Sequence, residues 1–306
     1  MATSLLDDGV ELRRSMFLEF RTAAEDVRQA AADADTSLSR AVHDYRKGLR
    51  RARALLRLLA GELPKPEVRA LRDALTDARR SLGAARDHAV ANEVLGRIDS
   101  DDERAAAKVI LDAAAAQSMA SSEIRQLLSE GAARTAAQVE LLDAALPTRI
   151  DWHVLLDGVR KTYGEARRAR KAAKQSRHAF HTFRRRCKEL AIQLDILARV
   201  AAPQLDDLRQ QIVDATDQLG DTVDLLMARD FVRTHGGGID KERVDLLRRA
   251  LRKDLDDKIH EGRRAARDVF RKKPRELARK LAKVAKREAA PVAAPPLMRG
   301  EEFAMT

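Results

Sequence analysis

The sequence predicts an all-α protein, on the strength of three observations. The 306 residues are dominated by Ala, Leu and charged residues, with 35% Asp, Glu, Lys and Arg and only 3% aromatic residues. Such a composition favours helices and leaves little material for strands. Long segments have apolar residues three and four positions apart and contain no proline. Finally, a motif of histidine and basic residues occurs in two of these segments.

Proline, glycine and acidic residues mark the ends of the expected helices, at Pro64 and Pro66, 99–102, Pro147, Pro203 and 236–238. The predicted helices cover 4–33, 36–61, 67–98, 101–145, 151–174, 177–201, 204–234 and 240–286. Pro274 is a candidate to divide the last helix, because proline cannot continue the backbone ladder. The tail 289–306 is rich in Pro and Ala without periodicity, so we expect it to be disordered.

An internal repeat is the most informative feature of the chain. The segment starting at His43 reads HDYRKGLR and the segment starting at His181 reads HTFRRRCK, 138 residues further on. Leu-Gly followed by Asp recurs at Leu82 and Leu219, so that the His-to-Gly separation is 40 residues in the first copy and 39 in the second. We therefore expect two pseudo-symmetric helical-bundle repeats of long helices, 1–146 and 147–288, around a basic central cleft.

The chain is strongly basic, with a formal net charge of +11, which points to an anionic partner. Cys187 is the single cysteine, so no intramolecular disulfide can form, as suits a reducing compartment. The acidic start of the chain is unlike a signal peptide, and no run of eighteen apolar residues occurs. We expect a cytoplasmic protein that does not span a membrane.

Each motif helix carries a basic stripe beside an apolar one. The first apolar stripe contains Val42, Tyr45, Leu49, Ala52, Leu56 and Leu59, and the second contains Phe180, Phe183, Cys187, Leu190, Leu194 and Leu197. The basic stripes follow one residue later, about 100° around the helix, with His43 and Arg46 in the first and His181 and Arg184 in the second. Two stripes that border packed interfaces can line one cleft.

A solvated helix face is the alternative interpretation of these stripes, but such faces normally mix charges. Residues 241–258 show that ordinary mixture, whereas residues 40–57 have seven basic residues against one acid and residues 160–189 have twelve against two. Like charges at this density destabilise a helix unless an anion neutralises them. The basic segment 263–287 fits the wall of a cleft and an ordinary solvated surface equally well.

These motifs resemble the conserved-histidine α-helical domain, or CHAD, family. The resemblance rests on His43 to Arg53, on Leu82-Gly83 with Arg86 and Asp87, on His181 to Lys188, and on Leu219-Gly220 with Asp224. Tyr163 with Arg167 and the segment 271–274 resemble further family features, so that one domain over about 10–285 is implied. The family implies a pseudo-symmetric helical fold whose basic central cavity binds inorganic polyphosphate. Ala191 departs from the pattern, since the family usually has a basic residue there.

The residues predicted to bind polyphosphate are the basic residues of these motifs and of the helices beside them. They are His43, Arg46, Lys47, Arg50, Arg51, Arg53, Arg167, Lys171, Lys174, His181, Arg184, Arg185, Lys188 and Lys273. Arginine suits this role because its planar fork matches phosphate oxygens. No catalytic residue, metal ligand or cofactor is predicted.

Three rival functions remain. A polyphosphate-metabolising enzyme would need converging carboxylates for Mg²⁺ or a phosphate loop; no such loop occurs, and Asp87 and Asp224 are better explained as partners of arginines. A metal site on His43 and His181 is disfavoured because basic residues surround both. RNA binding usually adds aromatic platforms, which this chain has few of. We therefore expect non-enzymatic polyphosphate binding in the cytoplasm, where polyphosphate granules are a candidate location.

Overall fold

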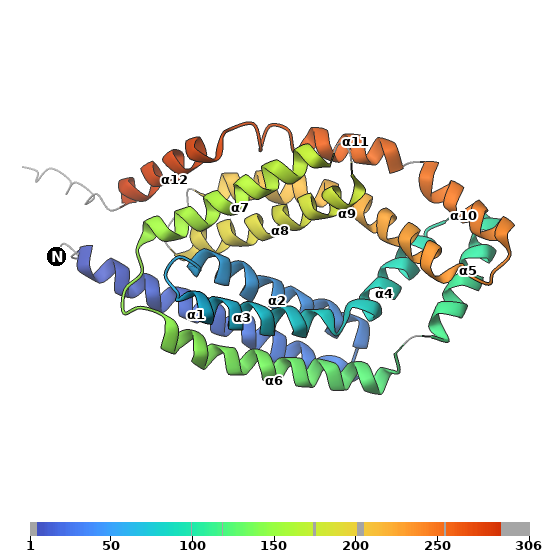
Figure 1. Ribbon diagram of the computed structural model, residues 1–306, viewed down its shortest axis with the longest axis horizontal. Helices are drawn as coiled ribbons and strands as arrows, with labels where there is room; N and C mark the ends of the chain where they lie inside the picture. The colour runs from blue at the N-terminus through green and yellow to red at the C-terminus, as the bar shows by residue number, and fades with distance from the viewer. Residues whose placement is uncertain are drawn as a thin grey trace, which may run out of the picture.

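The computed structural model describes residues 5–98, 100–117, 119–173, 176–200, 205–253 and 255–288, and these residues form helices joined by short turns without any strand (Figure 1). The all-α prediction is confirmed. The helices are α1 (Leu5–Ala32), α2 (Leu38–Leu59), α3 (Lys65–Arg80), α4 (Gly83–Gly96), α5 (Asp101–Ala115), α6 (Ser121–Ala145), α7 (Trp152–Ala172), α8 (Arg177–Val200), α9 (Asp206–His235), α10 (Lys241–Lys253), α11 (Leu255–Ala265) and α12 (Pro274–Glu288). A short 3-10 turn, η1 (Asp33–Asp35), follows α1. The predicted tail 289–306 and the predicted site residue Lys174 lie outside the described residues.

Three predicted helices are divided in the structure. The span 67–98 breaks at Ser81 and Leu82, and the span 101–145 breaks between Ala115 and Ser121. Packing overrides the continuous pattern there: α5 lies against α4 and α10, whereas α6 runs back along α1 and α3. The span 240–286 ends as a helix at Lys253 and again at Ala265, and Pro274 begins α12, where its missing N–H costs nothing.

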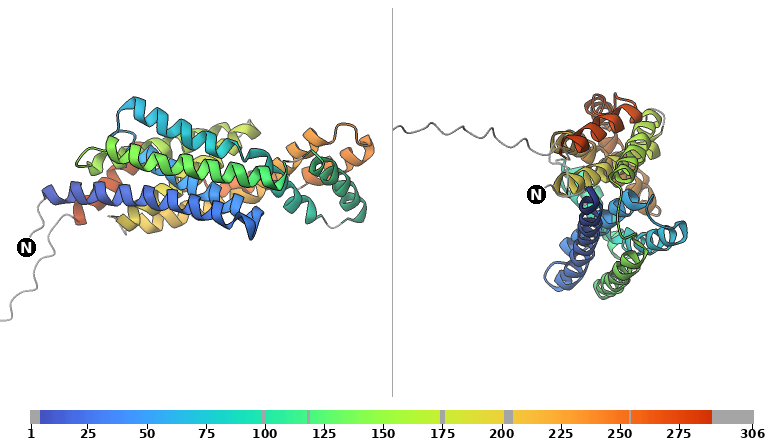
Figure 2. Two further views of the ribbon diagram at one scale, coloured as in Figure 1. Left: turned by 90° about the horizontal axis from the view of Figure 1, so that it is seen from below. Right: turned by 90° about the vertical axis from the view of Figure 1, so that its left-hand side faces the viewer.

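The helices form an elongated molecule with two packed groups. In Figure 1, α1, α2, α3 and α6 lie along the lower side and α7, α8, α9, α11 and α12 along the upper side, with α2 in contact with both α7 and α8. The side view in Figure 2 shows that α5 and α10 extend the molecule at one end. The two groups share a packing pattern. In the first, α1 packs against α2 and α6, and in the second, α7 packs against α8 and α12. A duplicated unit would give this pattern, and the duplication itself stays a prediction.

One main core runs through both groups of helices. Both predicted apolar stripes are buried in it, since every one of their residues is at most 7% exposed. The two halves touch closely: an ideal Cβ on Gly158 of α7 would stand 2.9 Å from the Cα of Leu58 in α2. Nearby, the buried Gln193 of α8 donates a hydrogen bond from Nε2 to the carbonyl of Ala54, at 3.2 Å. The motif helices α2 and α8 are therefore held side by side.

A smaller second core fills the end of the molecule. It is built by the apolar residues of α4, α5, the last turns of α9, and α10, among them Leu95, Ile110, Phe231 and Leu247. Within the described residues, no helix is both long and apolar enough to cross a membrane.

Candidate anion-binding site

Basic side chains from both halves of the chain meet beside the contact of α2 with α8. We call this group the basic cluster; it contains Arg46, Arg50 and Arg53 of α2, Arg79 of α3, Arg86 of α4, and Arg184, Arg185 and Lys188 of α8. Each member except Arg86 has its pKa lowered first by burial and then by the positive charge of neighbours in the cluster. The stripes of the two motif helices thus converge.

Arg46 has a structural role within the basic cluster. It is 9% exposed, and its Nη1 donates to the carbonyl oxygens of Arg79 (3.2 Å) and Leu82 (3.3 Å). These carbonyls lie where α3 stops and α4 begins. Arg46 gives the carbonyl of Arg79 a donor, and it is a second donor to the carbonyl of Leu82, which also accepts from the backbone N–H of Arg86 (3.4 Å). Burial, with Arg86, Arg79 and Arg50 nearby, lowers the pKa of Arg46 to about 10.

Arg50 and Lys188 lie in the middle of the basic cluster. Burial, together with the positive charges of Arg86 and Arg184, lowers the pKa of Arg50 to about 10. Burial likewise lowers the pKa of Lys188 to about 8, with Arg184 and Arg50 as the strongest positive neighbours. Arg50 belongs to the first motif and Lys188 to the second. Because each charge acts on the other, the two motifs lie at one site.

Arg184 approaches α9 closely because the residue opposite it is glycine. An ideal Cβ on Gly220 would stand 3.2 Å from Nη2 of Arg184, so the Leu-Gly step of the second copy makes room for the guanidinium. Asp224, one turn further along α9, is the strongest charge that raises the pKa of Arg184, although burial makes the net shift a lowering. His181, one turn before Arg184, has its pKa lowered by burial, while Asp230 opposes that shift.

An ion-pair network closes one end of the basic cluster. Arg57 of α2 pairs with Glu165 of α7 (2.9 Å) and with Glu189 of α8 (3.1 Å), and Arg186 pairs with the same two carboxylates. The positive stripe of α2 is therefore neutralised from Arg57 onward. Positive charge is in excess from Arg46 to Arg53 and across to α8, although Asp87 pairs with Arg86 (3.9 Å) and Asp224 partly offsets the charges of Arg184 and Lys188.

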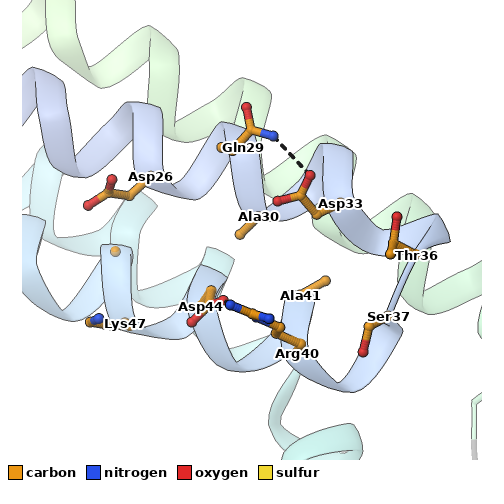
Figure 3. Close-up of a pocket in the computed structure, with 11 residues that line it drawn as sticks. Asp26, Gln29, Ala30, Asp33, Thr36, Ser37, Arg40, Ala41, Asp44 and Lys47 are labelled. Carbon is orange, nitrogen blue, oxygen red and sulfur yellow. Dashed lines mark hydrogen bonds and ion pairs between the residues drawn. The ribbon is translucent and has the colours of Figure 1, made fainter.

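Three predicted residues of the first motif lie away from this centre. Arg51 forms an ion pair with Glu19 of α1. Lys47 lines a separate polar pocket of about 660 Å³ between α1 and α2, which also contains Asp26, Asp33 and Asp44 (Figure 3). His43 is exposed at the start of α2. Adjacent positions on a helix point about 100° apart, which explains why Lys47 and Arg51 face α1, whereas Arg46 faces the break between α3 and α4 and Arg50 lies beside Arg86 and Arg184.

The predicted residues on α7 and near Pro274 surround a different junction. Arg167 donates from Nε to the carbonyl oxygen of Phe270 at 3.2 Å, while Lys171 and Lys273 are exposed. Arg170 donates to the carbonyl of Arg263. Its pKa is lowered mainly by burial and also by the charges of Arg263, Arg267 and Arg167. These residues form a second positive region where α7 meets the end of α11.

Two members of the basic cluster were absent from the predicted site residues. Arg86 had a sequence signal, because it belongs to the Leu-Gly motif, whereas Arg79 lies in no motif and reaches the site through the break between α3 and α4. Ala191, the departure from the family pattern, is half-buried against the core. Across the described ranges, no group of three or more His, Cys, Asp and Glu residues is arranged to hold a metal ion.

The fold and the basic cluster define an all-α protein with a concentrated positive centre shared by two motif helices. The chain belongs to the CHAD domain family, whose family model matches residues 18–233. The family relationship expected from the motifs is thus confirmed, and the family is associated in general with polyphosphate binding.

A solved structure has the same fold. The crystal structure of the CHAD domain from the plant Ricinus communis matches with a TM-score of 0.60 and 21% sequence identity, over 87% of this chain and 95% of that chain. No curated protein matches the sequence.

Proposed function

We propose that this protein binds inorganic polyphosphate on the basic cluster and does not alter it chemically. The observation that carries the proposal is the convergence of Arg50, Arg184 and Lys188, whose charges repel one another at a partly buried site that both halves build. Such an arrangement is costly in the free protein and is relieved by an anion with several closely spaced charges. A chain of phosphates satisfies many guanidinium groups at once.

The extended shape of the positive surface favours a long polymer over a single phosphate. The basic cluster spans α2, α3, α4 and α8, and the second positive region at Arg170 and Arg263 offers a continuation. His43, Lys47, Lys171 and Lys273 are exposed, so they can contact outer parts of a bound chain. A basic cleft along this path remains our proposal.

RNA is the second candidate, since backbone charge attracts any polyanion. The aromatic residues of the second motif, Phe180 and Phe183, are fully buried, so they cannot stack on bases. Specific single-strand binding needs successive stacking platforms, and a ligand made only of phosphates does not.

Titration in rising salt tests the proposal directly. Long-chain polyphosphate, pyrophosphate and a single-stranded RNA of matched charge are compared side by side. We expect the long polymer to bind most tightly and its affinity to fall steeply with salt as counterions are released. Equal affinity for pyrophosphate and the polymer would contradict the proposal of an extended site. Tighter binding of the RNA would favour the nucleic-acid alternative.

Three further measurements address chemistry, metal dependence and location. Polyphosphate incubated with the protein and Mg²⁺ keeps its chain length on a gel if the protein is only a binder. Binding is expected to persist with a chelator, because protein side chains supply the charge. A fluorescent fusion of the protein is expected to lie in the cytoplasm at polyphosphate granules. The same fusion with Arg50→Glu and Arg184→Glu is expected to leave the granules.

A further inference from the structure

A pocket of about 480 Å³ lies next to the basic cluster, between α4 and the last turns of α9. Its wall contains a short row of rings: the Phe231 ring centroid lies 4.4 Å from that of His235 and 5.8 Å from that of His88. Ala84 and Ala85 of α4 leave space opposite Met227 and Phe231. The rings are inclined to one another by 40° and 75°, and the pocket is lined mainly by apolar and aromatic side chains, as sites for ring-containing ligands commonly are.

One polar atom in the pocket, Nε2 of His88, lacks a partner that a ligand can provide, whereas Asp87 pairs with Arg86 (3.9 Å) and Asp230 with Arg233 (3.5 Å). Nε2 of His88 is buried and makes no hydrogen bond within the described part of the protein. The carboxylates of Asp87 and Asp230 also line the pocket, and both side chains are exposed to it. An unpaired buried nitrogen is costly, so a ligand that hydrogen-bonds to it gains affinity. Ring nitrogens and exocyclic amines of a nucleobase match this combination of groups.

The pocket borders the basic cluster, although no member of the cluster lines it. Met227, on the pocket wall, has its Sδ 3.1 Å from Nη1 of Arg86, which belongs to the cluster. Asp87 lines the pocket and also feels the charges of Arg86, Arg46 and Arg79. A ligand in the pocket can therefore extend a chain of phosphates directly onto the arginines.

We propose that this pocket binds the base of a purine nucleoside polyphosphate, such as ATP or GTP, whose phosphates occupy the basic cluster. This inference rests on the proposed phosphate site for its anionic half and on the pocket for its specificity. His235, which packs on the buried Phe231, provides the stacking surface, Asp230 accepts from an exocyclic amine, and His88 contacts a ring nitrogen. One pocket holds one base, so a discrete nucleotide fits better than a nucleic-acid strand.

The test compares ATP and GTP with inorganic triphosphate and with adenosine by calorimetry on the full chain. ATP carries no more negative charge than inorganic triphosphate, so a preference for ATP measures the base. We expect ATP to bind at least about tenfold more tightly than triphosphate, a difference of about 1.4 kcal/mol. Equal affinities for ATP, GTP and triphosphate would overturn the proposal.

Two variants separate the pocket from the phosphate site. Ala84→Trp fills the pocket from an exposed position, and His235→Ala removes a stacking ring; Ala89→Trp, also exposed on α4 but outside the pocket, is the matched control. Both pocket variants are expected to reduce ATP affinity to that of triphosphate while triphosphate and polyphosphate binding stay unchanged. The control keeps full ATP affinity.

The two proposals fail in different ways. If triphosphate and polyphosphate do not bind but ATP or adenosine binds and Ala84→Trp abolishes it, the base pocket stands and the polyphosphate site falls. If polyphosphate binds normally and ATP affinity is the same in Ala84→Trp, His235→Ala and the unmodified protein, the base pocket falls alone.

Discussion

The side chain of Arg46 hydrogen-bonds to the carbonyl of Leu82 (3.3 Å), where the chain passes from α3 into α4. The same nitrogen also reaches the carbonyl of Arg79. A residue of the first basic stripe thus fixes the helix break that brings Arg79 and Arg86 to the basic cluster. Arg50, one turn later on α2, has no hydrogen bond to a side chain or carbonyl among the described contacts, and its neighbours are mainly positive. We therefore expect Arg46 to serve mainly stability, and Arg50, one helical turn away, to be available to the proposed ligand.

Replacing Arg46 by Met is expected to destabilise the protein by about 1–3 kcal/mol, because the half-buried carbonyl of Arg79 loses this donor and the carbonyl of Leu82 keeps only the backbone N–H of Arg86. Arg50→Met is the matched control. It removes a buried charge that like charges surround, so the free energy of unfolding is expected to stay the same or to rise. Urea unfolding followed by circular dichroism measures both. A larger loss for Arg50→Met than for Arg46→Met would contradict this division.

Charge reversal at the meeting point of the motifs is expected to abolish polyphosphate binding with the helical content unchanged. The variant is Arg50→Glu with Arg184→Glu, one residue from each half. Arg249→Glu with Arg252→Glu changes the net charge equally at exposed positions of α10 and serves as the control. Filter binding at fixed salt compares them. A control as weak as the cluster variant would mean that binding depends only on overall charge.

The sequence was sufficient for the fold class and for the convergence of Arg50, Arg184 and Lys188, because helical periodicity fixes which residues share a face. It was not sufficient for Arg79, because that residue reaches the basic cluster through a break at Ser81 that no proline marks. Periodicity continues through such a break, and the hydrogen bonds from Arg46 that stabilise it come from a distant helix.

Lys47 and Arg51 show a second point that the motif alone does not determine. Both follow a cluster residue directly in the sequence, yet each points toward α1, where Glu19 pairs with Arg51. Only the position of α1 decides which side of α2 is neutralised. Sequence-based reasoning located the stripe, and tertiary packing selected the residues in it that remain without an acidic partner.

Gly158 is predicted to be essential for the contact between the two halves. An ideal Cβ there would lie 2.9 Å from Cα and 3.1 Å from the carbonyl oxygen of Leu58, which are backbone atoms that cannot move aside alone. Gly158→Ala is expected to lower the free energy of unfolding by about 1–3 kcal/mol, despite the better helix propensity of alanine. At Gly83 an added Cβ meets nothing within 4 Å, so Gly83→Ala is expected to be neutral or stabilising. Thermal unfolding of the two variants checks this contrast.

The affinity for polyphosphate is expected to fall as the pH rises through the pKa of Lys188. In the free protein that pKa is about 8, because burial and the charges of Arg184 and Arg50 disfavour the ammonium form. A bound polyanion stabilises the ammonium form, so the pKa in the complex is higher and binding takes up a proton between the two values. Below the pKa of the free protein the charge is already present, so affinity is highest there.

Calorimetry over the range from about pH 7 to about pH 9 measures this dependence, with a loss of about tenfold for each unit by which the pKa of Lys188 rises in the complex. The lowered pKa of His181 keeps its titration below this range, and Arg46 and Arg50, each with a pKa of about 10, titrate above it. Lys188→Arg is the decisive variant, because a guanidinium stays protonated throughout the range. It is expected to bind with a flat pH profile. An unchanged slope in Lys188→Arg would show that another group takes up the proton.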